Sequence, residues 1–313
     1  MIPKEGNGDL EGGIVPMLQE IIDEYIASLS LKEQGRGGTN QNTVVAYRND
    51  LKQVCSYLKR QQIENWQQVT HEHIAGYVLE MRDAQAYRPA TIARKLAALK
   101  SFFRYLESTG IITFDPIEKL DAPRIQRELP HVLSQEQINN LFRQVDVETT
   151  AGKRDFAMLH MLYATGMRVS ELISLNLGDF DAEGATIVCP GRNGRSKRER
   201  VLPLSSTVVK ATNRYLETAR PGLITRHPEE LALFLNHHGE RLTRQGFWLI
   251  IKGYARLAGI TEITPHMLRH SFAILMLQGG MELRSVQELL GHAHISTTQV
   301  YSQLARERVA TGV

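Results

Sequence analysis

The chain has 313 residues, of which 42% are hydrophobic and 23% are charged, and its formal net charge is +3. At ~100–200 residues per domain, this length predicts two domains that can each bury a hydrophobic core. A net charge this small does not by itself indicate nucleic-acid binding, so any DNA-binding surface must come from local clusters of Lys and Arg.

The composition also predicts a location. The two cysteines, Cys55 and Cys189, stand far apart and match neither a metal-ligand spacing nor a disulfide framework. Residues 1–13 are polar and glycine-rich and lack the apolar stretch of a signal peptide. No run approaches the ~18 apolar residues of a membrane span. We therefore expect a flexible N-terminus, no membrane association and a cytoplasmic protein.

Residues 14–113 predict an N-terminal helical domain. Apolar residues recur there at three- and four-residue steps, which is typical of helices that bury one face. The four expected helices cover residues 15–31, 43–61, 70–84 and 89–108.

The last of these helices carries a basic face. Its apolar stripe consists of Ile92, Leu96, Leu99, Phe103 and Leu106. Arg94, Lys100 and Arg104 point broadly away from that stripe. These cations form either an ordinary solvated helix face or a surface that contacts DNA phosphates, and the helix alone does not decide between the two.

A linker and a second domain follow. Residues 114–130 contain three prolines without helical periodicity, which predicts an extended linker. The second domain, residues 131–313, is expected to be mainly helical with a small antiparallel β-sheet. Its expected strands are 186–189 and 200–204, joined by the basic segment 191–198, with 231–235 as a candidate third strand. Capping residues predict helix starts at Ser134 (with Gln137 completing a capping box), Ser205, Thr243, Thr264 and Ser296.

Several short motifs of the second domain contain residues that could act on an anion. Arg168 follows a glycine-containing turn, and Glu171 lies three residues later, where it could orient the guanidinium. His266 and Arg269 share one side of a predicted helix, and a Leu-Gly-His motif and a Tyr come later in the chain. Each of these residues alone is more often structural: a surface ion pair, a satisfied histidine or a packed tyrosine.

Two histidine pairs have spacings that a zinc site could use. They are His266 with His270, and His292 with His294. Neither pair has a neighbouring Glu in the arrangement of a zinc protease, and no Cys is near, so no metal site is expected.

The order of the motifs is more specific than any single one. Residues 162–172, 266–273, 289–292 and 296–301 supply Arg, His-x-x-Arg, His, and a Tyr nine positions after that His. With these motifs the chain resembles the tyrosine recombinase (phage integrase) family, most closely its Xer-type branch, over nearly its whole length. The resemblance implies a four-helix, SAM-like core-binding domain and a catalytic domain with the DNA breaking-rejoining enzyme fold.

The resemblance also implies a mechanism. Tyr301 would attack phosphorus, form a 3′-phosphotyrosine and release a 5′-hydroxyl. Arg168, Arg269 and His292 would bind the phosphate oxygens and stabilise the charge of the transition state. His266 would assist proton transfer at the phenol, and the nearby arginines would favour the phenolate. Because the phosphotyrosine keeps the bond energy and cations supply the electrostatic stabilisation, no ATP, metal or other cofactor is expected.

The basic segment 191–198 departs from the family's pattern. Members usually have a Gly-Lys-Gly-x-Lys-x-Arg hairpin whose Lys protonates the leaving 5′-oxygen, whereas this segment is longer and has Arg192 or Arg195 where that Lys could match. Lys197 is its only lysine and is the favoured acid, because Arg gives up a proton poorly. Arg192 or Arg195 as a weaker acid, and reduced cleavage, are the alternatives. Both arginines are also expected to contact DNA.

The partners that the resemblance implies are double-stranded DNA of the nucleoid and other protomers. Four protomers would bridge two DNA sites, and a second recombinase or an activating protein could also take part. The 12 residues after Tyr301 (313 − 301) could dock on a neighbouring protomer. Chromosome or plasmid dimer resolution and mobile-element integration are the roles in view. The competing functions are a monomeric type IB topoisomerase and a DNA-binding protein that has lost cleavage.

Overall fold

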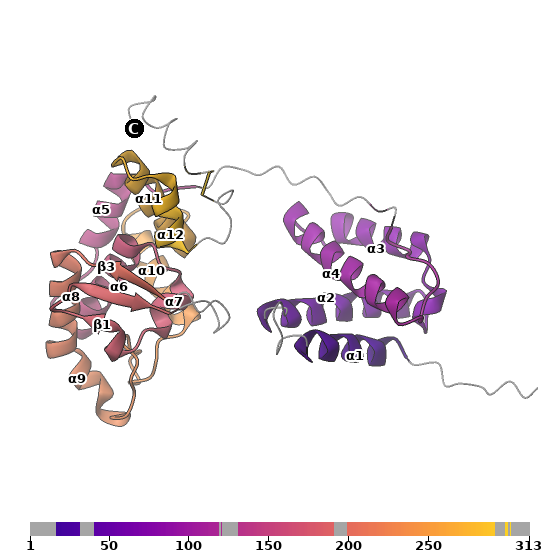
Figure 1. Cartoon of the computed structure of the whole chain (residues 1–313), viewed down its shortest axis with the longest axis horizontal. Coiled ribbons are helices and arrows are strands. Elements are labelled where there is room, and N and C mark those ends of the chain that lie inside the picture. Colours follow the sequence, from indigo (N-terminus) through magenta and orange to yellow (C-terminus); the bar gives the residue numbers. More distant parts are fainter. Residues whose placement is uncertain are drawn as a thin grey trace, which may run out of the picture. The chain divides into compact units, whose positions relative to one another are not determined.

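The computed structural model describes residues 17–31, 41–118, 120, 131–190, 199–291, 298–299 and 301. The chain divides into two compact units, residues 1–127 and 128–313, and each has its own hydrophobic core (Figure 1). No helix among the described residues is both long enough and apolar enough to cross a membrane.

The first unit is built from the helices that the apolar periodicity predicts. They are α1 (Leu18–Leu31), α2 (Gln41–Arg60), α3 (His71–Asp83) and α4 (Pro89–Ser108), with the short 3₁₀ helix η2 (Trp66–Gln68) between α2 and α3. The stripe predicted for α4 is buried throughout. Ile117 is also fully buried in this core, so packing continues beyond residue 113.

Aromatic packing fixes the position of α4 in the first unit. The buried Trp66 ring meets the Phe102 ring edge-on, with 4.7 Å between ring centroids, and its Nε1 donates a hydrogen bond of 3.0 Å to the Leu18 carbonyl. Edge-on aromatic pairs stabilise a core beyond the area that they bury, and the indole donor is satisfied without solvent. The apolar face of α4 is therefore held inward, while Arg94 and Arg104 lie on the exposed side of the helix.

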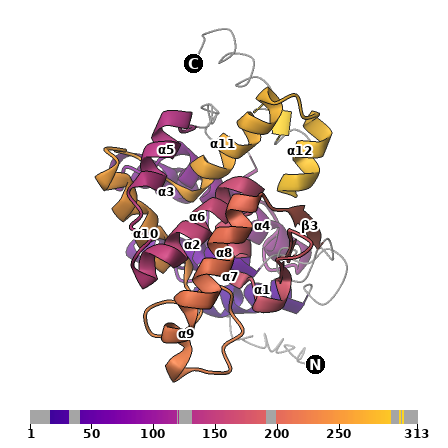
Figure 2. The ribbon, with the colours of Figure 1, turned by 90° about the vertical axis from the view of Figure 1, so that its left-hand side faces the viewer.

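The second unit is mainly helical. Its helices are α5 (Gln135–Arg143), α6 (Thr150–Thr165), α7 (Val169–Ser174), α8 (Ser206–Thr218), α9 (Arg220–Leu223), α10 (Arg244–Leu257), α11 (Pro265–Gln278) and α12 (Leu283–Leu290), with the 3₁₀ helices η3 (Leu177–Asp179) and η5 (Ile224–Arg226). Helix α6 lies at the centre of this unit in both views, and α8 and α11 pack against it (Figure 1, Figure 2).

Capping residues start these helices as predicted. Ser134 accepts a hydrogen bond from the Gln137 backbone while the Gln137 side chain accepts one from the Ser134 backbone, which is the predicted capping box. Thr264 caps α11, with Pro265 in the first helical position. The helix start predicted near Ser296 lies outside the described residues.

A three-stranded antiparallel sheet completes the unit, in the order β1 (Phe180–Asp181), β2 (Thr186–Cys189) and β3 (Arg200–Pro203). The third strand predicted at residues 231–235 is wrong. That segment makes only isolated bridges, Asn176 with Ala232 and Leu235 with Arg241, although residues 232–235 are buried. A short apolar run indicates burial but does not by itself distinguish a strand from irregular backbone.

Candidate active site

A glycine turn sets the position of Arg168. Helix α6 ends at Thr165, and its C-cap Gly166 has φ +60°, in the left-handed region that favours glycine. A Cβ atom on Gly166 would collide with the ring of Phe272 on α11. The turn therefore needs glycine for two reasons, and it places Arg168 at the N-cap of α7.

Glu171 orients Arg168, as the sequence predicts. One guanidinium nitrogen donates to Glu171 Oε1 at 2.9 Å, and the Arg168 backbone N–H donates to Glu171 Oε2 at 2.7 Å. The other terminal nitrogen donates to the carbonyl of Gly291, at 3.2 Å. The guanidinium is thus fixed on two sides while a quarter of its side chain, 24%, stays exposed.

Arg269 is held by the ends of two helices. From α11, its two terminal nitrogens donate to the carbonyls of Gly166 and Leu290, at 2.5 and 2.6 Å. These carbonyls lie at the C-terminal ends of α6 and α12, where backbone acceptors lack intrahelical partners and the helix dipole is negative. Together with Arg168, this side chain brings α6, α11 and α12 to one point.

Positive charge exceeds negative charge at this point. Arg200 from β3 donates to Glu171 Oε2 at 3.1 Å, so the carboxylate of Glu171 pairs with two guanidinium groups, those of Arg168 and Arg200. The charge of Glu171 also acts on a third guanidinium group, that of Arg269. Burial, followed by the charge of Arg168, lowers the pKa of Arg269 to about 10. Arg269 is still a cation at neutral pH. The described part of the site therefore favours an anionic ligand such as a phosphodiester.

We predict that the Glu171→Gln variant loses less stability in acid than the wild-type protein does. Burial raises the pKa of Glu171, but the Arg168 backbone N–H and the charges of Arg200 and Arg168 outweigh it, so the net shift is downward. A lowered carboxyl pKa stabilises the fold above the unfolded value and loses that contribution as pH falls through the folded value. Urea unfolding of both proteins at about pH 7 and about pH 3.5 measures the difference.

The Gln variant should show a smaller drop in the free energy of unfolding between the two pH values than wild type. Glu148→Gln is the matched control, because the ion pair of Glu148 with Arg214 is exposed. Equal drops in wild type and Glu171→Gln would show that the buried carboxylate is not the acid-sensitive group.

His266 lies in the first turn of α11. Its pKa is lowered by burial and then by the charges of Arg269, Arg168 and Arg244, so the ring is neutral at physiological pH. The two predicted cations and the predicted imidazole thus lie within electrostatic reach of one another.

Tyr301 is almost completely buried, with 2% of the residue exposed. Its hydroxyl makes a 2.6 Å hydrogen bond to Nδ1 of His270, one helical turn after His266. The sequence predicts His266 as the residue that serves this hydroxyl. The sequence analysis names His270 only as half of a rejected zinc pair. The role of His270 as the hydrogen-bond partner of Tyr301 was therefore missed from the sequence.

The net shift of the Tyr301 pKa is opposite in direction to the expected influence of the arginines. Burial raises the pKa of the phenol, and the charges of Arg269 and Arg168 lower it by a smaller amount. The predicted effect of the arginines is present, but the net shift is upward because desolvation of the phenolate is the larger cause. Without DNA, the phenol is therefore protonated at neutral pH.

The other predicted site residues are not all placed. His292, Lys197, Arg192 and Arg195 lie outside the described residues. Arg200, which follows them in the chain, does reach the site through Glu171 and also donates to the Cys189 thiol at 3.2 Å.

The basic face of α4 is partly engaged in its own unit. Arg94 and Lys95 both pair with the buried carboxylate of Asp50 on α2, although 46% of the Arg94 side chain is exposed. Lys100 donates to the Leu120 carbonyl at 3.0 Å, and Arg104 is exposed. Arg94 and Arg104 are therefore accessible to a ligand, whereas Lys100 also has a structural contact.

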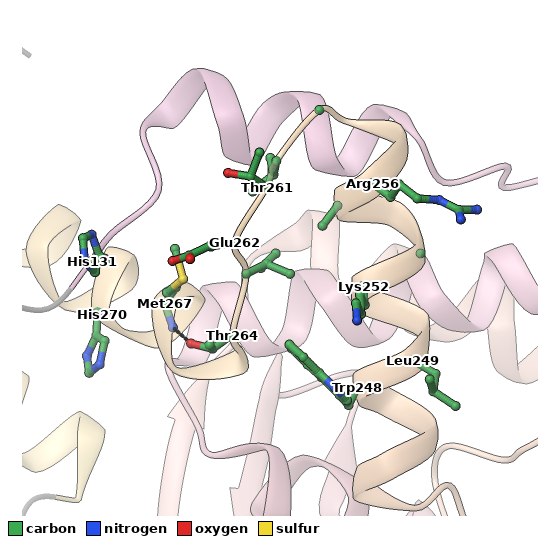
Figure 3. Close-up of a pocket in the computed structure, with 15 residues that line it drawn as sticks. His131, Trp248, Leu249, Lys252, Arg256, Thr261, Glu262, Thr264, Met267 and His270 are labelled. Atoms are coloured by element: carbon green, nitrogen blue, oxygen red, sulfur yellow. Dashed lines mark hydrogen bonds between the residues drawn. The ribbon is translucent and has the colours of Figure 1, made fainter. Parts of the chain in front are cut away.

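A cavity of about 870 Å³ lies beside the site, between α10 and α11 (Figure 3). Trp248, Lys252 and Arg256 line it from α10, and Met267 and His270 from α11. Figure 3 shows His270 at one edge of this cavity. Arg168, His266 and Arg269 are not part of its lining, so the cavity borders the arginine cluster rather than containing it.

Comparisons with known proteins identify the families and relatives that the chain is similar to. Residues 131–308 match the model of the phage integrase family, and residues 22–110 match that of the phage integrase N-terminal SAM-like domain. The tyrosine recombinase XerC of Roseiflexus sp. (strain RS-1) is 46% identical over 84% of this chain and 83% of its own. The tyrosine recombinase XerD of Oceanobacillus iheyensis is 40% identical over 94% of this chain and 96% of its own.

Two solved structures share the fold. The XerH site-specific recombinase bound to a palindromic difH substrate, in a post-cleavage complex, has a TM-score of 0.69 and 20% identity, covering 94% of this chain and 93% of its own. A lambda integrase fragment, a dimer bound to a COC′ core site, has a TM-score of 0.70 and 16% identity, covering 91% of this chain and 95% of its own.

A helical catalytic unit that gathers arginines, an imidazole and a buried tyrosine defines a class of enzyme that acts on phosphodiesters. The chain belongs to the phage integrase family, and within it to the Xer-type tyrosine recombinases. Its function is site-specific recombination of DNA through the 3′-phosphotyrosyl intermediate of that family, and neither topoisomerase activity nor DNA binding without cleavage is favoured.

Proposed function

We propose that Arg168 and Arg269 bind the non-bridging oxygens of one scissile phosphate and that Tyr301 attacks its phosphorus. The observation that carries this assignment is the shared environment of the three side chains. Both arginines are fixed by carbonyl or carboxylate groups, and the charges of both reach the Tyr301 hydroxyl. Charge that grows on a pentavalent phosphorus is stabilised most by cations that are already in place.

In this proposal His292 adds a hydrogen bond to the same phosphate, and His266 serves proton transfer close to it. The neutral state of His266 at physiological pH supports that second role, because a neutral imidazole can both accept and donate a proton. We also propose residues 14–113 as the core-binding domain and residues 131–313 as the catalytic domain. Residues 114–130 lie between them in the chain, and Ile117 among them still packs in the core of the first unit.

We propose further that the protein acts on double-stranded DNA of the nucleoid as a tetramer on two sites. The XerH structure is a complex with a difH substrate and the lambda integrase structure is a DNA-bound dimer, and these arrangements support the proposal. A second recombinase or an activator joins the assembly if the homotetramer alone does not complete recombination. Resolution of chromosome or plasmid dimers, or integration of a mobile element, is the outcome of such a reaction.

A plasmid experiment tests the function. The target is first identified as the DNA that the protein occupies most in its host, by crosslinking and sequencing. A supercoiled plasmid with two copies of that site should yield recombinant circles, and a plasmid with no copy should stay supercoiled. Relaxation of both plasmids without recombinants would instead support a type IB topoisomerase.

The basic face of α4 should contribute to DNA affinity through phosphate contacts. We predict that Arg94→Ala and Lys100→Ala each weaken binding to all sequences alike and reduce the slope of log K against log salt by about 0.9. Binding assays at several salt concentrations measure this slope. Arg214→Ala is the control, since Arg214 lies in the other unit and pairs on the surface with Glu148. Unchanged slopes for the α4 variants would identify this helix face as merely solvated.

Lys197 should protonate the leaving 5′-oxygen. We predict that Lys197→Ala lowers single-turnover cleavage by about 10²-fold or more, because general acid catalysis has that magnitude. A substrate with sulfur in place of the bridging 5′-oxygen should restore the rate, since a thiolate leaves without a proton. Arg192→Ala and Arg195→Ala are the matched comparisons. If sulfur restores one of these variants and not Lys197→Ala, that arginine is the acid.

A further inference from the structure

The hydrogen bond between Tyr301 and His270 joins the reacting atom of the enzyme to a group with no assigned role. The phenol oxygen and the imidazole Nδ1 are 2.6 Å apart, and the two rings have centroids 5.3 Å apart with an angle of 44° between their planes. His270 follows Arg269 directly on α11, so one helix supplies both a phosphate-binding cation and this contact. The geometry is that of a proton donor and its acceptor.

The protonation states decide which group donates. Burial, then the neighbouring His266 and the charge of Arg269, lower the pKa of His270 to about 4, so its ring is neutral at physiological pH. Burial raises the pKa of Tyr301, so the phenol keeps its proton. A neutral phenol is a better donor than a neutral imidazole N–H, which assigns the O–H as donor, Nδ1 as acceptor and the ring proton to Nε2.

We propose that His270 is a further catalytic residue, whose Nδ1 takes the proton of the Tyr301 hydroxyl as the phenol oxygen attacks phosphorus. The O–H bond breaks, its proton moves to Nδ1, and its electron pair becomes available for the new O–P bond. The bond from phosphorus to the 5′-oxygen breaks with its electron pair on that oxygen, which takes a proton from the general acid. In the rejoining step, Nδ1 returns its proton to the phenol oxygen.

The placement of the two histidines favours His270, rather than His266, as the group that takes the phenol proton. His266 is in the first turn of α11, where the helix dipole disfavours an added positive charge, and the charges of three arginines, Arg168, Arg244 and Arg269, lower its pKa. His270 lies one turn further along, and of these three arginines only Arg269 contributes to its shift. The negative charge of a bound phosphate opposes the field of Arg269, so DNA binding makes His270 a stronger base.

The inference rests on the proposed role of Tyr301 as nucleophile. His270→Asn tests it, because the Asn amide oxygen can accept a hydrogen bond near the position of Nδ1 but does not take up a proton at neutral pH. We expect DNA binding within about twofold of wild type and single-turnover cleavage of a nicked substrate lowered by about 10²-fold or more. His238→Asn, at an exposed histidine, is the control and should cleave like wild type.

A fluorinated tyrosine at position 301 separates proton transfer from positioning. Its phenol has a lower pKa and needs less help to lose its proton, so the loss caused by His270→Asn should shrink to less than about tenfold in that background. An equal loss in both backgrounds would mean that His270 only positions the phenol, and the proposal would be overturned.

Two other outcomes also overturn the proposal. One is that His270→Asn cleaves at the wild-type rate, and the other is that it cleaves faster than wild type. A faster variant would show that the contact restrains Tyr301 in the DNA-free protein. These failures differ from failure of the nucleophile assignment. If Tyr301 is not the nucleophile, the covalent adduct forms without it, whatever residue stands at position 270.

Discussion

Tyr301→Phe is expected to abolish the covalent protein–DNA adduct and to lower strand cleavage by on the order of 10⁴-fold or more. The variant keeps the aromatic ring that is buried against α11 and α12 and loses only the oxygen that would bond to phosphorus. DNA binding should therefore change little. A nicked suicide substrate traps the adduct, which is measured after denaturation as a species of lower mobility.

Tyr163→Phe is the matched control for this experiment. Its hydroxyl makes a long hydrogen bond of 3.3 Å to Gln135, away from the arginine cluster, so its removal should leave adduct formation intact. If Tyr301→Phe still forms the adduct, another residue is the nucleophile, and the assignment of the whole site to one phosphorus is wrong.

Arg269→Ala should combine a large loss of cleavage with a loss of stability. Removal of one preorganised donor to a developing negative charge costs about 10²–10³ in rate. The same substitution leaves the carbonyls of Gly166 and Leu290 without the donor that they share, and hydrogen bonds to a charged group contribute about 1.5–3 kcal/mol each. Single-turnover cleavage and urea unfolding measure the two effects separately.

Arg269→Lys is the informative companion, because it keeps the charge but presents one ammonium group instead of a planar fork. We expect it to recover part of the cleavage rate and little of the stability, since one nitrogen does not span two carbonyls on different helices. An Arg269→Ala protein that unfolds like wild type would contradict the structural half of this prediction, and one that cleaves like wild type would contradict the catalytic half.

Local chemistry made much of the fold predictable. The stripe on α4 is buried as its spacing predicts, and Ser134 and Thr264 cap the helices that they were expected to start. The pairing of Glu171 with Arg168 follows from a separation of three residues across a helix start. Each of these features depends on neighbours in the chain, and such relations can be inferred from periodicity and capping rules.

Features that depend on tertiary packing were not predictable in the same way. Residues 232–235 are apolar and buried, and their sequence does not indicate whether the backbone pairs in a sheet. The contact of His270 with Tyr301 joins two residues that are 31 positions apart in the chain, so it depends on the tertiary fold. The upward shift of the Tyr301 pKa likewise results from burial, which competes with the arginines and has no local signature in the sequence.

The two arginines that we propose as phosphate ligands both contact the C-terminal end of α12. Arg168 and Arg269 hold the carbonyls of Gly291 and Leu290, and Tyr301 follows Gly291 by ten positions in the chain. Under the proposed roles, the guanidinium groups that bind the phosphate are the same ones that hold the end of α12. A ligand that moves these guanidinium groups is therefore expected to disturb the two hydrogen bonds that fix this helix end.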